Sequence, residues 1–565
     1  FELFESLQIS QIKVNNAVVN YSRLSNRVRV PVFAAAESNF VIEVFYSGTP
    51  PTAQTNPLGG SGLTAGSSPS WGNKVVWSLS EPFSAYEWFP VKQSLTDKAD
   101  SCAVAITVPD TCKAGSNGVL QSVTPLGNGQ TRYEWKHKHP IDYYLISVAV
   151  AKYVDYSIYA NPVGSPNPVL IQNYIYDNPQ TLPNFIDDIN ETVDFLELFA
   201  TQFGPYPFAN EKYGHCMAPI GGGMEHQTMT TQGFFEKTLT AHELAHQWWG
   251  NHVTCASWCD IWLNEGFASY AEYLMLAQLY SGQQSGHMNQ VHQNVMSQPG
   301  GSVWVLDSLN EARIFNGRLT YDKGAAIIHT IRYIINNDNL FFDALKDFQL
   351  TYAHSTATGL DFKNHVANFC NLDLDAFFEQ WYFGEGYPTY QVSYNQVGND
   401  LVLQISHSSS MPTVTPTFTN PINLRLQRTG FADTIVRFPI TSNSDLFILN
   451  NFGQLSGNIT IDPFNWVVNG TAGVSMDPTL SAGQTLPTYQ KGILLFPNPT
   501  NDFIQIFEQA IEYNYIIYSS IGTLIAQGNL QPGQKIDVGA YKPGDYICYF
   551  SDASKNKFVK LVTIK

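Results

Sequence analysis

Residues 240–246 read TAHELAH and lie in a segment, residues 237–250, whose apolar pattern predicts a helix. The last five residues of this stretch form an HExxH motif, in which His246 follows His242 by four positions. Residues four apart share one face of a helix, so both imidazoles can point at one metal ion. Zinc accepts such nitrogens, and a catalytic zinc needs a third protein ligand beside an open position for water.

A second segment supplies a candidate for that third ligand. Residues 262–268 read WLNEGFA at the start of another predicted helix, and eighteen residues separate Glu265 from His246. A glutamate here completes a site of two histidines and one carboxylate. Glu243 follows the first histidine and is placed to act on the metal-bound water. Glu272 lies two turns further along and is a candidate hydrogen-bond acceptor for a ligand histidine.

Simpler interpretations of these residues remain open at this point. Thr240 and Glu243 have the spacing of a capping box at a helix start, and histidines on helices are usually solvent-exposed or core residues. Glu272 also fits an ordinary glutamate on a helix surface. The downstream carboxylate is the observation that favours a metal site.

With two further segments, these motifs resemble the M1 family of zinc aminopeptidases, the group that contains aminopeptidase N. The further segments are residues 221–226, GGGMEH, and Tyr321 in the sequence YDKGA. The resemblance extends over residues 1–477. It implies a zinc-dependent aminopeptidase that cleaves the N-terminal peptide bond of peptides. It also implies one Zn²⁺ per chain, with His242, His246 and Glu265 as ligands and Glu243 as the general base.

The resemblance also assigns residues that bind the substrate amine. In the family, a glutamate of a GxMEN motif binds the free α-amino group, and Gly222, Gly223, Met224 and Glu225 match this motif. A fixed carboxylate that pairs with the terminal ammonium sets how far the peptide reaches past the zinc. His226 stands where the family has asparagine, so the alignment of the substrate backbone by that side chain is in question. The alternative for the glycines is a flexible turn.

Two more residues take roles from the family. Tyr321 corresponds to a tyrosine whose hydroxyl faces the oxyanion of the tetrahedral intermediate, where a donor stabilises developing charge. Glu81 precedes Pro90 of the pair Phe89-Pro90 by nine residues, the interval at which the family has a second amine-binding residue. The alternatives are that Tyr321 only starts a helix and that Glu81 is a surface glutamate.

The expected fold class is multidomain α+β, since 565 residues exceed what one hydrophobic core accommodates. Short alternating runs predict a β domain in residues 1–184, a helical period follows in residues 185–388, and alternation returns in residues 389–477. The resemblance implies an N-terminal β domain that lacks the family's first strands, a mainly helical thermolysin-like (gluzincin) catalytic domain and a β-sandwich domain. A polar linker, residues 478–491, precedes a small C-terminal β-sandwich, residues 492–565. Since no helical array follows residue 477, we expect an unroofed active-site cleft.

Particular elements are expected within these domains. The apolar run of residues 143–154 predicts a buried strand, and residues 50–72, rich in Gly, Ser, Pro and Thr, predict a surface loop. Helices are expected at residues 187–203, 237–250, 261–280, 321–336, 341–352 and 374–383.

The C-terminal segment resembles the sorting domain of proteins exported by the type IX secretion system. It contains LFPNP, SIG, PGDY and a terminal lysine, in that order, at residues 495–499, 520–522, 543–546 and 565. The alternative is a small carbohydrate-binding or interaction β-sandwich. The resemblance implies contact with the secretion machinery and a location outside the cell, secreted or attached to the outer membrane of a Gram-negative bacterium.

Composition excludes several other classes of protein. The net charge is -17 and no run of lysine and arginine occurs, so a nucleic-acid partner is not expected. No apolar stretch reaches 18 residues, so no transmembrane segment is expected. Seven cysteines are too few for a disulfide scaffold, and only Cys255 and Cys259 are close enough to suggest a local bridge, with free thiols as the alternative.

The residues therefore predict metal-assisted peptide hydrolysis on substrates with a free N-terminus. An epoxide hydrolase or an endopeptidase on the same zinc site is the alternative among enzymes. A surface binding protein with a vestigial site is the alternative outside them.

Overall fold

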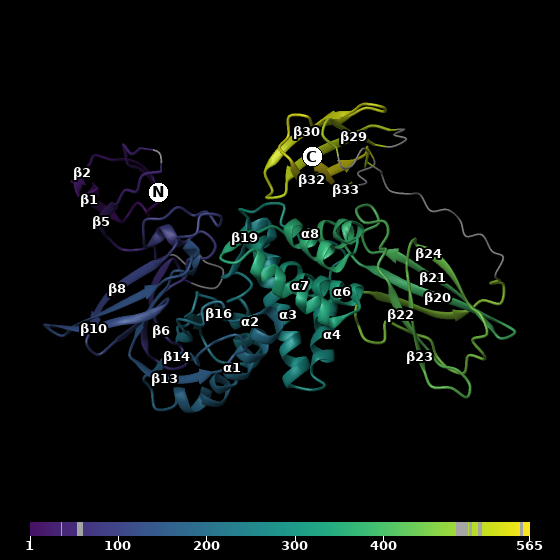
Figure 1. The fold of residues 1–565 in the computed structure, drawn as a ribbon, viewed down its shortest axis with the longest axis horizontal. Helices are drawn as coiled ribbons and strands as arrows, with labels where there is room; N and C mark the ends of the chain where they lie inside the picture. Colours follow the sequence, from purple (N-terminus) through teal and green to yellow (C-terminus); the bar gives the residue numbers. More distant parts are fainter. Residues whose placement is uncertain are drawn as a thin grey trace. The chain divides into compact units, whose positions relative to one another are not determined.

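The computed structural model describes residues 1–35, 37–52, 60–481, 495–496, 500–506, 511–553 and 557–564. Most of the predicted linker lies outside the described residues, as do Pro497, Asn498, Pro499 and Lys565 of the C-terminal motifs. Contacts divide the chain into two compact units, Phe1–Thr254 with Gln349–Thr356, and Cys255–Phe348 with Ala357–Lys565. Each unit has its own helices and sheets (Figure 1).

A mixed five-stranded sheet carries part of the candidate site in the first unit. Its strands, in sheet order, are β13 (Tyr153–Ala160), β14 (Val169–Tyr176), β15 (Tyr213–Met217), β17 (Thr230–Gln232) and β16 (Gly223–Met224). β15 pairs in parallel with both of its neighbours, and all of its residues are buried, as expected for an inner strand covered on both faces. The edge strand β16 ends at Met224, which sets the position of Glu225 directly after it.

The alternating segments before residue 153 also form strands. They include β7 (Lys74–Ser78), β8 (Cys102–Pro109), β9 (Lys113–Ser116), β10 (Val119–Gly127), β11 (Gln130–His137) and β12 (Val148–Ala151). The loop prediction for residues 50–72 is wrong in part, because Leu63–Ser67 forms β6, which pairs with β7. Pairing to a neighbouring strand stabilises this small-residue segment, and local composition does not show it.

The prediction of one strand over residues 143–154 is also wrong in part. Tyr143–Leu145 forms a 3₁₀ turn, and only then do β12 and the first residues of β13 follow. All three residues of the turn are buried. An apolar run indicates burial, but burial does not distinguish a strand from a helical turn.

Two helices complete the part of the first unit that positions the site. α1 (Thr181–Phe203) contacts β13, β14 and α2 (Lys237–Ala245). The Glu236 carboxylate caps α2 by accepting hydrogen bonds from the backbone N–H groups of Thr238 and Leu239 at 2.9 and 3.2 Å. The capping-box alternative for Thr240 and Glu243 is therefore wrong, since Thr240 lies inside the helix.

Two helices cross closely in the second unit. α3 (Trp262–Leu279) packs against α6 (Gly324–Ile335), and a Cβ atom added at Gly266 would lie 3.0 Å from the backbone of Gly324. Only glycine at both positions allows this approach. The helix predicted to begin at Tyr321 instead starts as a π-helical segment, η4 (Gly317–Lys323), which runs directly into α6.

Two long helices of the second unit, and the short α5 (Glu311–Ile314), are missing from the sequence prediction. α4 (Gln284–Met296) is rich in glutamine, asparagine and histidine, so its apolar period is weak. α8 (Gly359–Cys370) begins with a capping box, because Thr358 Oγ1 accepts from the N–H of Asp361 and the Asp361 carboxylate accepts from the N–H of Thr358. The other helices include α7 (Asp338–Thr351), α9 (Asp375–Phe377) and the π-helical η5 (Phe378–Phe383).

Strands return after the helices. β20 (Pro388–Val397), β21 (Asp400–Ser409), β22 (Ile422–Leu426), β23 (Thr434–Phe438), β24 (Ser444–Leu449), β25 (Thr460–Ile461) and β26 (Gly470–Met476) form two sheets, ordered β24-β21-β20-β26 and β23-β22-β25. Cys255 and Cys259 form no disulfide with each other, so the local bridge suggested by their spacing is not formed. No helix among the described residues combines the length and the apolar character that a bilayer crossing needs.

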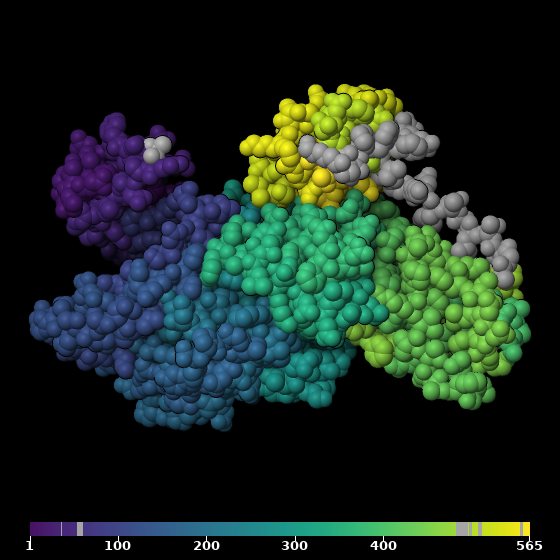
Figure 2. Space-filling model, in the orientation of Figure 1, coloured from purple at the N-terminus to yellow at the C-terminus, as the bar shows by residue number. Residues whose placement is uncertain are grey.

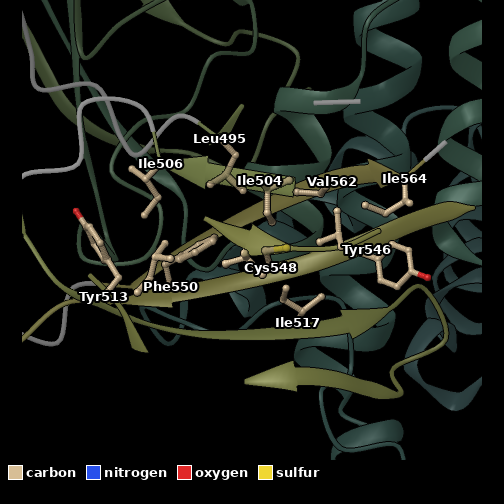
Figure 3. Close-up of a cluster of buried hydrophobic side chains, with 13 residues drawn as sticks. Leu495, Ile504, Ile506, Tyr513, Ile517, Tyr546, Cys548, Phe550, Val562 and Ile564 are labelled. Carbon is tan, nitrogen blue, oxygen red and sulfur yellow. The ribbon is translucent and has the colours of Figure 1, made fainter. Parts of the chain in front are cut away.

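The C-terminal segment is a compact β structure with its own core (yellow in Figure 2). Its strands are β27 (Leu495–Phe496), β28 (Phe503–Ile506), β29 (Tyr513–Ser519), β30 (Leu524–Leu530), β31 (Ile536–Asp537), β32 (Gly544–Ser551) and β33 (Lys557–Ile564). They form sheets ordered β27-β28-β31 and β30-β29-β32-β33. Side chains from both sheets meet in the core shown in Figure 3, among them Ile504, Ile517 and Cys548.

Candidate active site and metal centre

Helix α2 presents the two histidines of the HExxH motif. His242 and His246 are buried, and their ring centroids lie 4.8 Å apart. Nδ1 of His246 lies 2.9 Å from the backbone carbonyl oxygen of Trp249. Because a carbonyl can only accept, Nδ1 carries the proton and the neutral ring leaves the Nε2 lone pair for a metal ion.

Glu265 supplies the carboxylate from the first turn of α3 and is 3% exposed. His242, His246 and Glu265 form a group that could hold a metal ion, since one ligand atom from each lies within 4.8 Å of the others. Two imidazole nitrogens and one carboxylate oxygen are the donor set of a catalytic zinc site, so these residues fit zinc. The three residues named from the sequence therefore come together.

Glu243 lies on the same helix, is buried, and packs against the edge strand β16. A Cβ atom at Gly223 would collide with the carboxylate of Glu243. Gly222 and Gly221, in contrast, have open space where a Cβ would lie. Gly223 is therefore required for the position of Glu243, whereas the flexible-turn alternative would make the three glycines equivalent.

Glu225 and Glu81 are both buried, at 3% exposure each, so Glu81 is not the surface glutamate of the alternative interpretation. Together with Glu265 they form a second group in which one carboxylate oxygen from each lies within 4.8 Å of the others. Three carboxylates so close repel one another when ionised, and a cation between them relieves the repulsion. The arrangement is therefore suited to bind a positive charge beside the candidate metal site.

His226, the departure from the family motif, is fully buried. Its Nδ1 lies 2.9 Å from Oγ1 of Thr231 on β17, and burial lowers the pKa of the ring to about 3. At neutral pH the ring is therefore uncharged. His226 contributes no positive charge beside Glu225.

Tyr321 lies in the π-helical segment η4 and is half-buried. A Cβ at Gly266 would lie 3.4 Å from the carbonyl oxygen of Thr320, so the backbone just before Tyr321 approaches the backbone just after Glu265. A π-helical turn changes the direction of its side chains relative to the following α-helix, and such turns are frequent at functional sites. The role of Tyr321 at the oxyanion stays a prediction.

Two residues that the sequence interpretation missed position Glu225. Nε2 of Gln247 and Nδ2 of Asn251 donate to the Glu225 carbonyl oxygen at 3.3 and 2.8 Å, and Gln247 Oε1 accepts from the N–H of Thr228 at 2.9 Å. Gln247 directly follows the second histidine of the motif. An amide residue directly after the HExxH motif is the sequence signal that could have identified it.

Comparison with known families matches two segments of the chain. Residues 226–381 match the peptidase family M1 domain, and residues 494–565 match the secretion system C-terminal sorting domain. The first segment includes His242, Glu243, His246, Glu265 and Tyr321. Glu81 and Glu225 lie before it.

Curated relatives with similar sequences are aminopeptidases. Mouse aminopeptidase N is 32% identical over 181 residues, which cover 28% of this chain and 18% of the relative. Leucine aminopeptidase 2 of the yeast Vanderwaltozyma polyspora is 24% identical over 421 residues, which cover 68% of this chain and 60% of the relative. The matched region spans about a quarter or less of the length of the first four relatives.

Solved structures share the fold. An M1 zinc metallopeptidase mutant from Deinococcus radiodurans, bound to a Tyr-Ser-Ala substrate, has a TM-score of 0.57 and 23% identity and covers 65% of this chain and 82% of its own. Aminopeptidase A of Legionella pneumophila, in complex with aspartic acid, has a TM-score of 0.68 and 15% identity and covers 83% of this chain and 55% of its own. The chain therefore has the multidomain fold of M1 metallopeptidases, a family whose zinc the His-His-Glu group could bind.

Proposed function

We propose that the chain is a zinc-dependent M1 aminopeptidase, exported by a type IX secretion system, that removes the N-terminal residue of peptides. His242, His246 and Glu265 hold one zinc ion in this proposal. The observation that carries it is the pair of groups that share Glu265, a donor set for a metal and a cluster of three carboxylates for a cation. A peptide N-terminus is such a cation, and its first peptide bond follows immediately.

The residues divide the chemistry between them. Bound zinc would polarise the scissile carbonyl and lower the pKa of the attacking water. Glu243 takes the proton from that water and passes it to the leaving amine. Tyr321 donates a hydrogen bond to the oxyanion, a contact that strengthens as charge develops. Glu225 and Glu81 hold the substrate ammonium, and Gly222, Gly223 and Met224 line the substrate beside them.

The carboxylate cluster distinguishes an aminopeptidase from an endopeptidase. An ammonium held by Glu225 and Glu81 fixes the N-terminus, so only the first peptide bond reaches the metal. An N-acetyl group removes the positive charge, so the substrate no longer forms a charge-assisted hydrogen bond with these carboxylates. The exopeptidase role therefore requires a free amine on every substrate.

A pair of matched peptides tests this function. We expect zinc-loaded protein to cleave a free tripeptide amide and to leave its N-acetylated form intact, with one zinc per chain by elemental analysis. Glu225→Ala should weaken binding of the free peptide. Equal cleavage of the two peptides would identify an endopeptidase, and a folded chain that binds no zinc would identify a vestigial site.

The domain layout belongs to the same proposal. Residues 1–184 form the N-terminal β domain, residues 185–388 the thermolysin-like catalytic domain and residues 389–477 a β-sandwich. Residues 492–565 form the sorting domain, for which the match of residues 494–565 is the support. We propose that this domain delivers the enzyme to the cell exterior, released or attached to the outer membrane.

A further inference from the structure

The C-terminal sheet has a second buried face that its own core does not use. In β32 the side chains of Tyr546, Cys548 and Phe550 belong to the domain's core (Figure 3). Alternation along a strand directs Ile547 and Tyr549 to the opposite face. Ile547 is nevertheless 0% exposed, and Leu561, its partner on β33, is 8% exposed. Another part of the chain therefore covers this face.

Aromatic side chains show which part it is. Trp304, which belongs to the same compact unit, is 1% exposed, and its ring lies 6.1 Å from that of Tyr549 and 5.9 Å from that of Tyr518 on β29. On the other side Trp304 contacts Phe383, the last residue of η5, at 5.8 Å. The indole is therefore enclosed by rings from the helical region and from the C-terminal sheet, at distances typical of favourable aromatic pairs.

Polar contacts join the same two surfaces and set their relative position. Lys560 Nζ donates to Oε2 of Glu379 at 2.8 Å, and the N–H of Leu561 donates to Oε1 of the same carboxylate at 3.3 Å. Both charged side chains of this pair are largely buried, at 25% and 21% exposure. Asn364 on α8 donates to the Asp545 carboxylate on β32 at 3.0 Å. One carboxylate that accepts from a side chain and from the neighbouring backbone is specific for position as well as for charge.

We propose that the surface around Trp304 and Glu379 is a docking site for the chain's own C-terminal domain. The domain binds there through the face of β29, β32 and β33 that lies opposite its own core. Docking buries Trp304 and places Lys560 next to Glu379. The C-terminal domain and the helical region therefore stabilise each other. The sorting domain is thus held on the folded peptidase, and only its remaining faces are available to other proteins. This inference does not depend on the proposed peptidase activity.

A designed disulfide in the full-length chain tests the contact. A Cβ atom added at Gly522, at φ +80°, would meet Sγ of Cys259, whereas one added at Gly533, at φ +77°, would have nothing within 4 Å. Cysteine carries the same backbone strain at both positions, which makes them a matched pair. With oxidised glutathione as the oxidant, Gly522→Cys should form a disulfide to Cys259, detected by peptide mass spectrometry. Gly533→Cys should not form it.

One further variant serves as the control for the position of the cross-link. Cys259→Ser added to Gly522→Cys should abolish the cross-link. Burial raises the pKa of Cys259 to about 11, so both variants are oxidised at the same alkaline pH, where more of the thiol is ionised. A cross-link no more frequent in Gly522→Cys than in Gly533→Cys would overturn the docking proposal.

Charge reversal at Glu379 and Lys560 tests the ion pair between the two surfaces in the same cysteine background. In the Gly522→Cys background, Glu379→Lys places two cations together and should slow cross-linking at least about fivefold. Adding Lys560→Glu restores an ion pair of opposite polarity and should recover most of the rate. Equal cross-linking rates in all three proteins would exclude Glu379 and Lys560 as the contact that holds the domain.

Discussion

At the scale of single residues, the neighbours of Glu243 determine where its carboxylate lies. It is buried on α2 between two histidines, and the adjacent edge strand leaves room for its carboxylate only because residue 223 is glycine. A carboxylate held this way keeps one orientation. Two variants test the proton transfer by Glu243 and the position of its side chain separately.

Glu243→Gln should retain zinc and lose about 10²–10⁴-fold in kcat, because the amide keeps the shape of the side chain but cannot take a proton. Elemental analysis and steady-state kinetics on one preparation measure both quantities. Near-native turnover with zinc bound would contradict the assignment of the general base.

Gly223→Ala should lower kcat/KM by at least about tenfold while zinc stays bound, because the new methyl group displaces the Glu243 carboxylate. The matched control is Gly221→Ala, whose methyl group enters open space and should change kcat/KM little. If both variants had the same kinetics, the contact between residue 223 and Glu243 would not matter for activity.

At the scale of elements, the crossing of α3 and α6 sets where Glu265 and Tyr321 lie relative to each other. Gly266 follows Glu265, and Gly324 begins α6 three residues after Tyr321. Their backbones approach each other with no side chain between them, because both residues are glycine. This crossing connects the proposed third metal ligand to the proposed oxyanion donor.

Gly266→Ala should destabilise the protein by about 1–3 kcal/mol, because the added methyl group meets the backbone of Gly324, which has no side chain to rotate away. Gly286→Ala in α4 is the control, since that position is open and alanine favours a helix. Thermal unfolding followed by circular dichroism measures the difference. A Tm for Gly266→Ala at or above that of Gly286→Ala would show that the crossing relaxes freely.

At the scale of the whole molecule, the C-terminal segment has two relations to the rest of the chain. Its own core makes it a separate structural part, whereas its outer face packs on the helical region of the same unit. Neither of the two candidate cation-binding groups, His242-His246-Glu265 and Glu81-Glu225-Glu265, takes a residue from this segment. We therefore expect the segment to contribute to stability and export but not to catalysis.

Removal of residues 482–565 should leave kcat/KM on a small aminoacyl substrate close to that of the full chain. It should also lower the free energy of unfolding of the remainder by about 1–3 kcal/mol, because Trp304 becomes exposed. In the native host the truncated enzyme should stay inside the cell. Normal secretion would contradict the sorting role, and loss of activity in a folded, zinc-loaded truncation would contradict its separation from catalysis.

Residues with a local signature could be identified from the sequence alone. A spacing of four places His242 and His246 on one helix face, and WLNEGFA places Glu265 at the start of another helix. Most long helices and alternating strands were predictable for the same reason, since their periodicity is a property of neighbouring residues. The sequence interpretation missed the polar helix α4, and it took part of a buried run, Tyr143–Leu145, for strand.

The contacts between distant residues depend on the folded backbone. Glu81 joins Glu225 and Glu265, a meeting that only the family resemblance implied beforehand, Gly223 makes room for Glu243, and Gly266 meets Gly324. The tertiary structure also gave Ile547 and Trp304 a common buried surface, although each lies in an ordinary stretch of sequence. Such contacts join segments tens to hundreds of residues apart, and their energies depend on the folded backbone. The periodicity of neighbouring residues does not predict these contacts.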